Sequence, residues 1–172
     1  MSSKLLIDNN AISRSITRIC HEILEKNKGV KNLVLAGIRT RGYFLALRIA
    51  KKIEEIEGIK VNVIEIDITD YRDDINKNKS TNFKIEYDLK DKNVILIDDV
   101  MFTGRTVRAA IDCILDFYRP CKILLAVLID RGHRELPIRA DFVGKNVPTS
   151  LNEKIKVHLN EVDSEDCVLI TN

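Results

Sequence analysis

The sequence predicts an α/β fold, in which a central, mostly parallel sheet is flanked by helices on both faces. Three short runs are wholly apolar, as in strands buried on both sides, at residues 33–36, 94–97 and 123–129. Segments with apolar residues at helical spacing alternate with them, at residues 12–24, 43–56 and 105–117. A length of 172 residues favours one domain, so we expect residues 1–172 to form a single unit.

The first helix is expected to be capped by a residue from Asp8 to Asn10 and to end at Gly29. Residues 37–42 then form a loop after the first strand, and residues 61–68 form a β-branched strand after the second helix. Residues 69–92 are polar, with almost no apolar periodicity from Tyr71 to Asn82, which predicts a long loop with a functional role.

The last part of the chain is less regular. Residues 130–150 show no clear period, and two short strands are expected near residues 154–159 and 167–170.

The composition is that of a globular protein, with 45% hydrophobic and 31% charged residues. No apolar run is long enough for a membrane span, and the N-terminal apolar run is too short for a signal peptide. The cysteines form no C-x-x-C pair and the three histidines are scattered, so no zinc spacing is present and His133 and His158 are expected to be structural. All four cysteines have apolar neighbours, which predicts buried, reduced thiols and a cytoplasmic location.

The net charge of +2 is unevenly distributed. Residues 1–60 carry +6, residues 61–99 carry −4, residues 100–145 carry +3 and residues 146–172 carry −3. If the fold brings the two basic segments together, they can form a face for an anion or a nucleic acid. The alternative is that the basic residues lie on solvent-exposed helix faces without a binding role, and the charge distribution alone favours that alternative.

Three loops with unusual chemistry follow predicted strands, at residues 37–42, 98–106 and 130–134. Ligands of parallel α/β sheets bind outside the carboxyl ends of the strands, so we expect these loops to converge on one site.

The second of these loops is the most informative. A buried strand delivers two adjacent carboxylates, Asp98 and Asp99, which is costly unless a cation or hydroxyl donors face them. Thr103, Gly104 and Thr106 then open a helix, whose free N–H groups and neighbouring hydroxyls can hold a phosphate. One loop therefore offers acceptors for sugar hydroxyls and donors for a phosphate, which matches a ribose 5-phosphate.

Other interpretations of these loops fit less well. An ordinary capped turn would explain a lone Thr-Gly but not the whole pattern from Val94 to Thr106. Gly37 and Gly42 have Walker spacing, but Tyr43-Phe44 stands where Lys and Ser or Thr are needed, and no G-x-G-x-x-G is present. A phosphoacceptor domain with an acidic pair is disfavoured because the Thr-Gly-Arg-Thr loop follows that pair directly.

Residues 94–106 strongly resemble the motif for 5-phosphoribosyl-1-pyrophosphate (PRPP) of the type I phosphoribosyltransferases. The resemblance implies that Asp98 and Asp99 hold the ribose hydroxyls and that residues 102–106, the phosphate loop, hold the 5′-phosphate. The PRPP and UMP contacts implied in this way are Asp98, Asp99, Val100, Met101, Phe102, Thr103, Gly104, Arg105, Thr106, Asp130, Arg131 and Val157.

The same resemblance makes residues 37–42 the diphosphate loop, in which Arg39, Thr40 and Arg41 receive the leaving group. Arg72, on the long polar loop, would close over the site and exclude water. Mg²⁺ is implied as a cofactor that arrives on PRPP and is not bound directly by the protein. The sequence shows no clear protein general base.

Residues 130–150, 66–74 and 16–22 are similar to one branch of this family. Its members convert uracil and PRPP to UMP and diphosphate, and they also regulate pyrimidine operons by transcription attenuation. The likeness implies a small hood subdomain, formed by residues from about 130 to 172 and the N-terminal segment, over the uracil. The segment between Asp74 and Val94 departs from the branch because it is several residues shorter.

The branch also implies an RNA partner, the leader mRNA of a pyrimidine operon. The residues assigned to the RNA surface are Thr17, His21, Arg134, Arg139 and Lys145. UMP, with UTP as a second candidate, would be the regulatory nucleotide, and a homodimer or higher homo-oligomer is expected. Two alternatives stay open: a nucleobase-salvage phosphoribosyltransferase without RNA binding, and a nucleotide sensor with negligible catalysis.

Overall fold

The computed structural model describes residues 3–73 and 85–172. Its centre is a five-stranded sheet of order β3-β2-β4-β5-β6, in which every neighbouring pair is parallel. The strands of this sheet are β2 (Leu33–Ile38), β3 (Asn62–Ile66), β4 (Asn93–Met101), β5 (Lys122–Asp130) and β6 (Phe142–Asn146). The predicted α/β class and parallel sheet are therefore confirmed.

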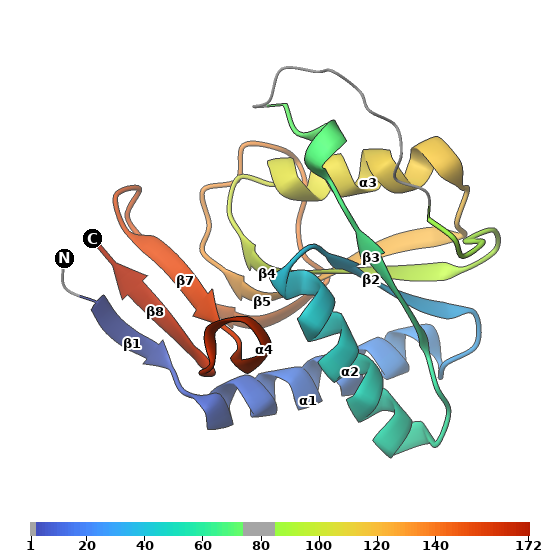
Figure 1. Cartoon of the computed structure of the whole chain (residues 1–172), viewed down its shortest axis with the longest axis horizontal. Helices are drawn as coiled ribbons and strands as arrows, with labels where there is room; N and C mark the ends of the chain where they lie inside the picture. The colour runs from blue at the N-terminus through green and yellow to red at the C-terminus, as the bar shows by residue number, and fades with distance from the viewer. Residues whose placement is uncertain (1–2, 74–84) are drawn as a thin grey trace.

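Helices cover both faces of this sheet (Figure 1). The long helices are α1 (Asn9–Asn27), α2 (Arg41–Glu57) and α3 (Arg105–Phe117). Alternate side chains of the strands point to opposite faces, so Leu35 and Ile95 pack in one core with α1 and α2, whereas Ala36 and Leu96 pack in the other with α3. This two-sided burial explains why the central strands are apolar throughout.

The two chain ends meet in a second, three-stranded antiparallel sheet of order β1-β8-β7, which we call the hood sheet. Its strands are β1 (Ser3–Ile7), β7 (Lys154–His158) and β8 (Cys167–Thr171), and the short helix α4 (Asn160–Asp163) connects the last two (Figure 1). The two C-terminal strands had been predicted, whereas β1 and α4 had not.

The ends of α1 follow the predicted capping. The Asp8 carboxylate accepts a hydrogen bond from Ala11 N, which satisfies a free amide of the first turn. At the other end, Gly29 N donates to Leu24 O and Lys28 N donates to Glu25 O. This is the Schellman arrangement, and its left-handed residue is Lys28 rather than the expected Gly29, although Gly29 also has a positive φ of 105°.

Four local expectations are wrong. The diphosphate loop is much shorter than six residues, because β2 runs to Ile38 and α2 begins at Arg41. Strand β4 does not end before the acidic pair but continues through it to Met101. Residues 130–150 are not irregular throughout, because β6 adds a fifth parallel strand there.

The fourth concerns the cysteines: Cys20, Cys113 and Cys167 are buried as expected, but Cys121 is exposed. The expected long loop at residues 69–92 begins with a short 3-10 helix, Thr69–Tyr71. The shortened segment between Asp74 and Val94 falls largely on residues 74–84, which lie outside the described part. No helix of the described residues is long and apolar enough to cross a membrane.

Strand order reverses at β2, because the chain passes from β2 outward to β3 and then returns to β4 on the other side. Ligands of open α/β sheets bind in the crevice at such a switch point, outside the carboxyl ends of the strands. The topology therefore selects the ends of β2 and β4, where residues 39–41 and 98–105 lie.

Candidate active site

The acidic pair lies on the part of β4 that extends beyond β2. The last β2–β4 partners are Gly37 and Ile97, whereas β4 continues beside β5 through the pairs Val100–Ile129 and Met101–Asp130. Asp98 and Asp99 therefore stand where their strand has lost a neighbour on one side, at the edge of the crevice.

Asp98 is in an unfavourable environment for a charge. It is buried, and burial together with the adjacent Asp99 carboxylate raises the pKa of Asp98 well above its ordinary value. One Asp98 oxygen accepts a hydrogen bond from Asp99 N at 2.9 Å, and one Asp99 oxygen accepts from Val100 N at 2.8 Å. Hydrogen-bond donors from a ligand would relieve this destabilised arrangement.

Gly42 brings the diphosphate loop against the acidic pair. A Cβ built on Gly42 would overlap Ile97 O and lie 3.3 Å from the Asp98 Cα. A Cβ on Gly37 would lie 2.7 Å from Tyr43 N, inside normal contact. Both glycines are thus required for close backbone approach, and the first turn of α2 packs directly on β4 beside Asp98.

The two arginines of the diphosphate loop are held by carboxylates. The exposed Arg39 donates to Asp67 at 3.1 Å and forms a 3.5 Å ion pair with Glu65. Arg41 donates through two nitrogens to Asp163, at 2.7 and 3.3 Å. Arg41 therefore joins α2 to the end of α4, so the hood sheet and the diphosphate loop share one salt bridge.

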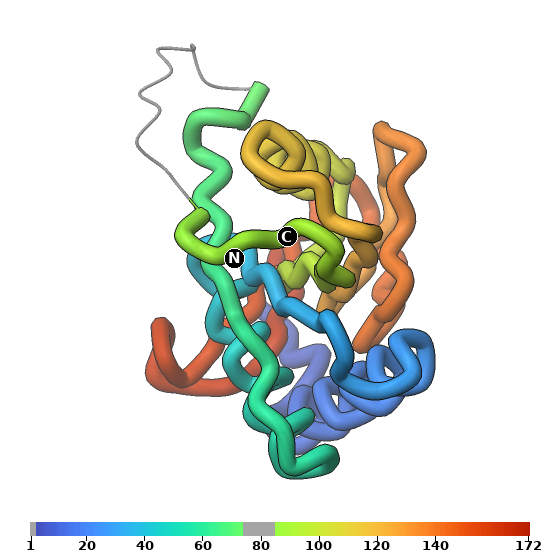
Figure 2. Tube along the Cα trace, turned by 90° about the vertical axis from the view of Figure 1, so that its right-hand side faces the viewer, coloured from blue at the N-terminus to red at the C-terminus, as the bar shows by residue number. Residues whose placement is uncertain are grey.

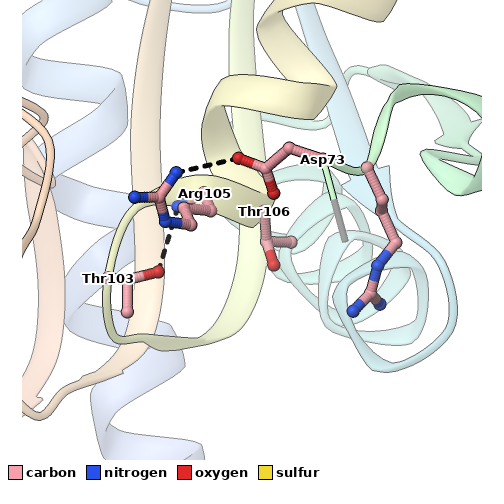
Figure 3. A pocket seen from close by; sticks show the side chains of 5 residues that line it. Asp73, Thr103, Arg105 and Thr106 are labelled. Carbon is pink, nitrogen blue, oxygen red and sulfur yellow. Dashed lines mark hydrogen bonds and ion pairs between the residues drawn. The ribbon is translucent and has the colours of Figure 1, made fainter. Parts of the chain in front are cut away.

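The phosphate loop opens α3 without a capping side chain. The N-cap residue is Gly104, with φ of 93°, and it has no side chain that could accept from the amides of the first turn. Arg105 N donates to the Thr103 hydroxyl at 3.3 Å, and the Thr106 side chain lies beside them (Figure 3). The positive end of the helix dipole and the two hydroxyls leave this turn suited to an anion.

A pocket of about 180 Å³ opens at this turn. Its lining residues come from the phosphate loop and from the start of the polar loop: Arg72, Asp73, Thr103, Arg105 and Thr106. The Asp73 carboxylate points to Arg105 and accepts a hydrogen bond from it at 2.8 Å (Figure 3). Arg105 also donates to Glu135 at 2.8 Å, so this arginine links three segments of the chain.

Phe102 of the phosphate loop is contacted by two residues that follow β5. The buried Arg131 guanidinium lies 3.9 Å from the Phe102 ring centroid, and the His133 ring meets the same ring edge-on at 6.0 Å. Arg131 donates to the Thr149 hydroxyl at 3.0 Å, and His133 Nε2 lies 2.6 Å from Thr149 O. The phosphate loop is therefore tied, through Phe102, to the segment that leads into the hood sheet.

The remaining predicted contacts lie around the same edge. Asp130, buried at the end of β5, accepts from Gly132 N at 3.0 Å and forms a 3.6 Å ion pair with Arg134. The Met101 and Val157 side chains are buried in the two cores, so these residues can reach a ligand only through their backbones. Val157 lies on β7, an edge strand of the hood sheet with one unpaired backbone side among the described strands.

A groove of about 490 Å³ lies over one face of α1, and all of its lining residues belong to that helix rather than to the loops that follow the strands. Thr17 and His21 line it together with Arg14 and Arg18. Arg18 crosses to β6, where it donates to Val143 O at 3.0 Å and to Gly144 O.

Strand β6 packs against α1 (Figure 2). At the other end of this contact, Lys26 forms a 3.8 Å ion pair with Asp141. The exposed Lys145 follows Gly144 on the same strand, so its backbone lies next to the carbonyl that Arg18 reaches. Arg134 is held at Asp130 and Arg139 is exposed, and no described contact joins either of them to α1.

The carboxylate partners of the site arginines were missed from the sequence: Asp67, Asp73, Glu135 and Asp163. The signal that could have found most of them is the alternation of charged segments. Arg39 and Arg41 of the first basic segment pair with the two acidic segments, and Arg105 of the second basic segment pairs with Asp73.

Comparison with known proteins shows the family to which the chain belongs. The pattern described as "Phosphoribosyl transferase domain" matches residues 2–159, so the chain belongs to the phosphoribosyltransferase family. Within that family it is 60% identical to "Bifunctional protein PyrR" of Clostridioides difficile, over 96% of each chain. The Bacillus subtilis protein of the same name is 55% identical over 96% of this chain and 95% of its own. The predicted family and branch are therefore confirmed.

The fold also matches solved structures. The hypoxanthine phosphoribosyltransferase of Trypanosoma cruzi superposes with a TM-score of 0.75 at 18% identity, covering 97% of this chain and 95% of its own. At that identity the likeness shows the shared fold and carries no information about the base.

Proposed function

We propose that this chain is a uracil phosphoribosyltransferase, which converts uracil and PRPP to UMP and diphosphate, and a UMP-responsive RNA-binding regulator of pyrimidine operons by transcription attenuation. The observation that carries the enzymatic part is the contact at Gly42. This contact packs the first turn of α2, which follows Arg39, against β4 beside Asp98 at the switch point, and β4 leads on through the phosphate loop to the start of α3.

In this proposal each part of PRPP meets a group of suitable chemistry. Asp98 and Asp99 accept from the ribose hydroxyls, and the first turn of α3 with Thr103 and Thr106 holds the 5′-phosphate. The diphosphate lies over Arg39, Thr40 and Arg41, and the positive charge of the two arginines stabilises the leaving group as the ribosyl carbon becomes cationic.

Mg²⁺ fits this edge because carboxylate and hydroxyl oxygens are the donors it prefers. It would enter with PRPP, held by the diphosphate, and would supply positive charge to the leaving group. Arg72, at the start of the polar loop and on the rim of the pocket, would close over the bound substrate and exclude water.

The uracil would lie between the end of β5 and the hood sheet. Asp130 and Arg131 lie on that side of the acidic pair, and the free edge of β7 offers backbone groups at Val157. Backbone donors and acceptors suit a base that presents alternating carbonyl and N–H groups.

The RNA surface in this proposal is the α1 groove together with the β6 edge. Thr17 and His21 supply polar contacts to unstacked bases, and Lys145 supplies positive charge from the neighbouring strand. Arg134 and Arg139 extend the positive charge along residues 134–145.

One preparation can test both activities. Leader RNA of a pyrimidine operon is titrated with and without UMP, and UMP formation from uracil, PRPP and Mg²⁺ is assayed in parallel. UMP should tighten RNA binding, and RNA should then tighten UMP binding by the same factor. If the protein forms UMP but does not bind RNA at low salt and saturating UMP, it is a salvage enzyme and the regulatory part of the proposal is wrong. If it binds RNA but forms no UMP, it is a nucleotide sensor and the enzymatic part is wrong.

A double substitution separates the two activities. Thr17→Ala with His21→Ala should abolish leader-RNA binding and leave the rate of UMP formation unchanged, because the groove is lined by α1 alone and by none of the loops at the switch point. Glu25→Ala, at the end of the same groove, is the matched control and should not weaken RNA binding, since it removes no donor or positive charge. Loss of catalysis in the double variant would contradict the separation.

A further inference from the structure

The hood sheet brings together three side chains that can bind a metal ion, far along the chain from the acidic pair. His158 ends β7 and Cys167 begins β8, and the two residues are direct partners in the antiparallel register. Glu165 belongs to the short segment that follows α4. Cross-strand partners project from the same face of a sheet, so the strand pairing itself holds the imidazole beside the thiol.

The ligand atoms of the three residues are close together. His158 Nδ1 lies 2.7 Å from a Glu165 carboxylate oxygen, and the nitrogen, oxygen and sulfur atoms all lie within 4.8 Å of one another. A tetrahedral zinc ion holds its nitrogen, oxygen and sulfur ligands at about 2.0–2.3 Å, which places them about 3.3–3.8 Å apart. Small side-chain rotations therefore suffice to admit an ion.

The carboxylates next to the cluster are paired elsewhere, and the cluster itself is accessible. Asp163 and Asp166 flank the cluster in the chain and form salt bridges with Arg41 and Arg48. Cys167 is buried, whereas the His158 and Glu165 side chains are 25% and 58% exposed. The cluster therefore has an inner sulfur ligand and an open side, where an ion can enter and a water can complete its coordination.

We propose that His158, Glu165 and Cys167 bind one divalent transition-metal ion of the zinc class, with water as a fourth ligand. One thiolate, one imidazole and one carboxylate select zinc-like ions over Mg²⁺ and Ca²⁺, which take oxygen ligands. The ion would clamp β7 to β8 and brace α4, whose last residue, Asp163, holds Arg41. This site does not depend on the proposed function.

Co²⁺ is the probe, because a Co²⁺–thiolate bond gives a charge-transfer absorption that Co²⁺ bound to nitrogen and oxygen alone does not give. The full-length protein, treated with chelator and dialysed, should bind one Co²⁺ per chain with this band, and Zn²⁺ should displace it. Cys167→Ser should abolish the band, and Glu165→Gln should weaken Co²⁺ binding at least tenfold. Glu165 is exposed, so that second variant is expected to fold even if Cys167→Ser does not.

The exposed thiol elsewhere in the chain provides the control. Cys121→Ser should leave the Co²⁺ spectrum and affinity unchanged. Three results would each overturn the proposal: no charge-transfer band at one equivalent of Co²⁺, a band that is lost in Cys121→Ser, or Co²⁺ affinity that is unaffected by Glu165→Gln.

Discussion

Replacement of the buried acidic residue by its neutral isostere should stabilise the protein while it weakens substrate binding. In Asp98→Asn the volume is kept, but the buried charge and its repulsion with Asp99 are removed. Relief of a destabilised active site is expected to add about 0.5–2 kcal/mol to the free energy of unfolding. For a chain of this size that corresponds to an increase in Tm of about 1–8 °C.

The sign of the pH dependence follows from the direction of the pKa shift. The folded state holds the pKa of Asp98 above its unfolded value, so the folded wild-type protein binds the proton more tightly and loses stability as pH rises. The loss begins above the ordinary aspartate pKa of about 3.9 and ends at the raised folded pKa. The stability advantage of Asp98→Asn should therefore be close to zero near pH 4 and grow toward neutral pH.

Asp67→Asn is the control with the opposite sign. The Thr69 hydroxyl, with the Thr69 amide and Arg39, lowers the pKa of Asp67 despite partial burial. Wild-type Asp67 therefore contributes stability at neutral pH that is lost as pH falls through the ordinary aspartate range, and its substitution should lower Tm most at neutral pH.

Urea unfolding of both variants from pH 4 to pH 8, with PRPP binding by calorimetry, measures these effects. A charged hydrogen bond contributes about 1.5–3 kcal/mol, so PRPP should bind about 10- to 150-fold more weakly to Asp98→Asn. A destabilised Asp98→Asn at pH 7, a stability difference independent of pH, or unchanged PRPP affinity would refute the reasoning.

Three further substitutions test other parts of the site. Arg39→Ala should lower kcat/KM and leave Tm within about 1–2 °C of wild type, since an exposed surface residue rarely contributes more than about 0.5 kcal/mol; a lower Tm with unchanged kinetics would make the loop purely structural. Gly42→Ala should raise KM for PRPP and lower Tm because the new Cβ overlaps Ile97 O, and wild-type values for both would show that this approach is not needed. Lys145→Ala should weaken leader-RNA binding and reduce its log–log salt slope by about one unit if it contacts a phosphate, whereas Lys156→Ala, an exposed lysine on the hood sheet, should change neither.

The sequence predicts those parts of the fold that depend on local pattern. Strands β2, β4 and β5 are apolar because both faces are buried, so their positions follow from composition. The α3 helix has the expected bounds because its glycine and hydroxyl-rich start is a local signal. The acidic pair stands out in the sequence because it interrupts a buried apolar run, although it lies within β4 rather than after it.

The parts that depend on distant partners were not predicted. β1 is too short and too ordinary in composition to identify alone, and it is a strand because β8, more than 150 residues later, pairs with it. Asp163 belongs to the site only because the hood sheet carries α4 to Arg41. β6, with its glycine, lysine and asparagine, is a strand because it pairs with the edge of β5.

The hood sheet also determines the order in which parts of the chain can fold during synthesis. β8 is its central strand, and it is the last of the described strands to leave the ribosome. The parallel sheet can assemble from residues 33–146 while β1, already synthesised, still lacks its partner. The salt bridge between Arg41 and Asp163 forms only when this late strand has paired. In a nascent chain the phosphate loop can therefore form before the diphosphate loop is held by its salt bridge.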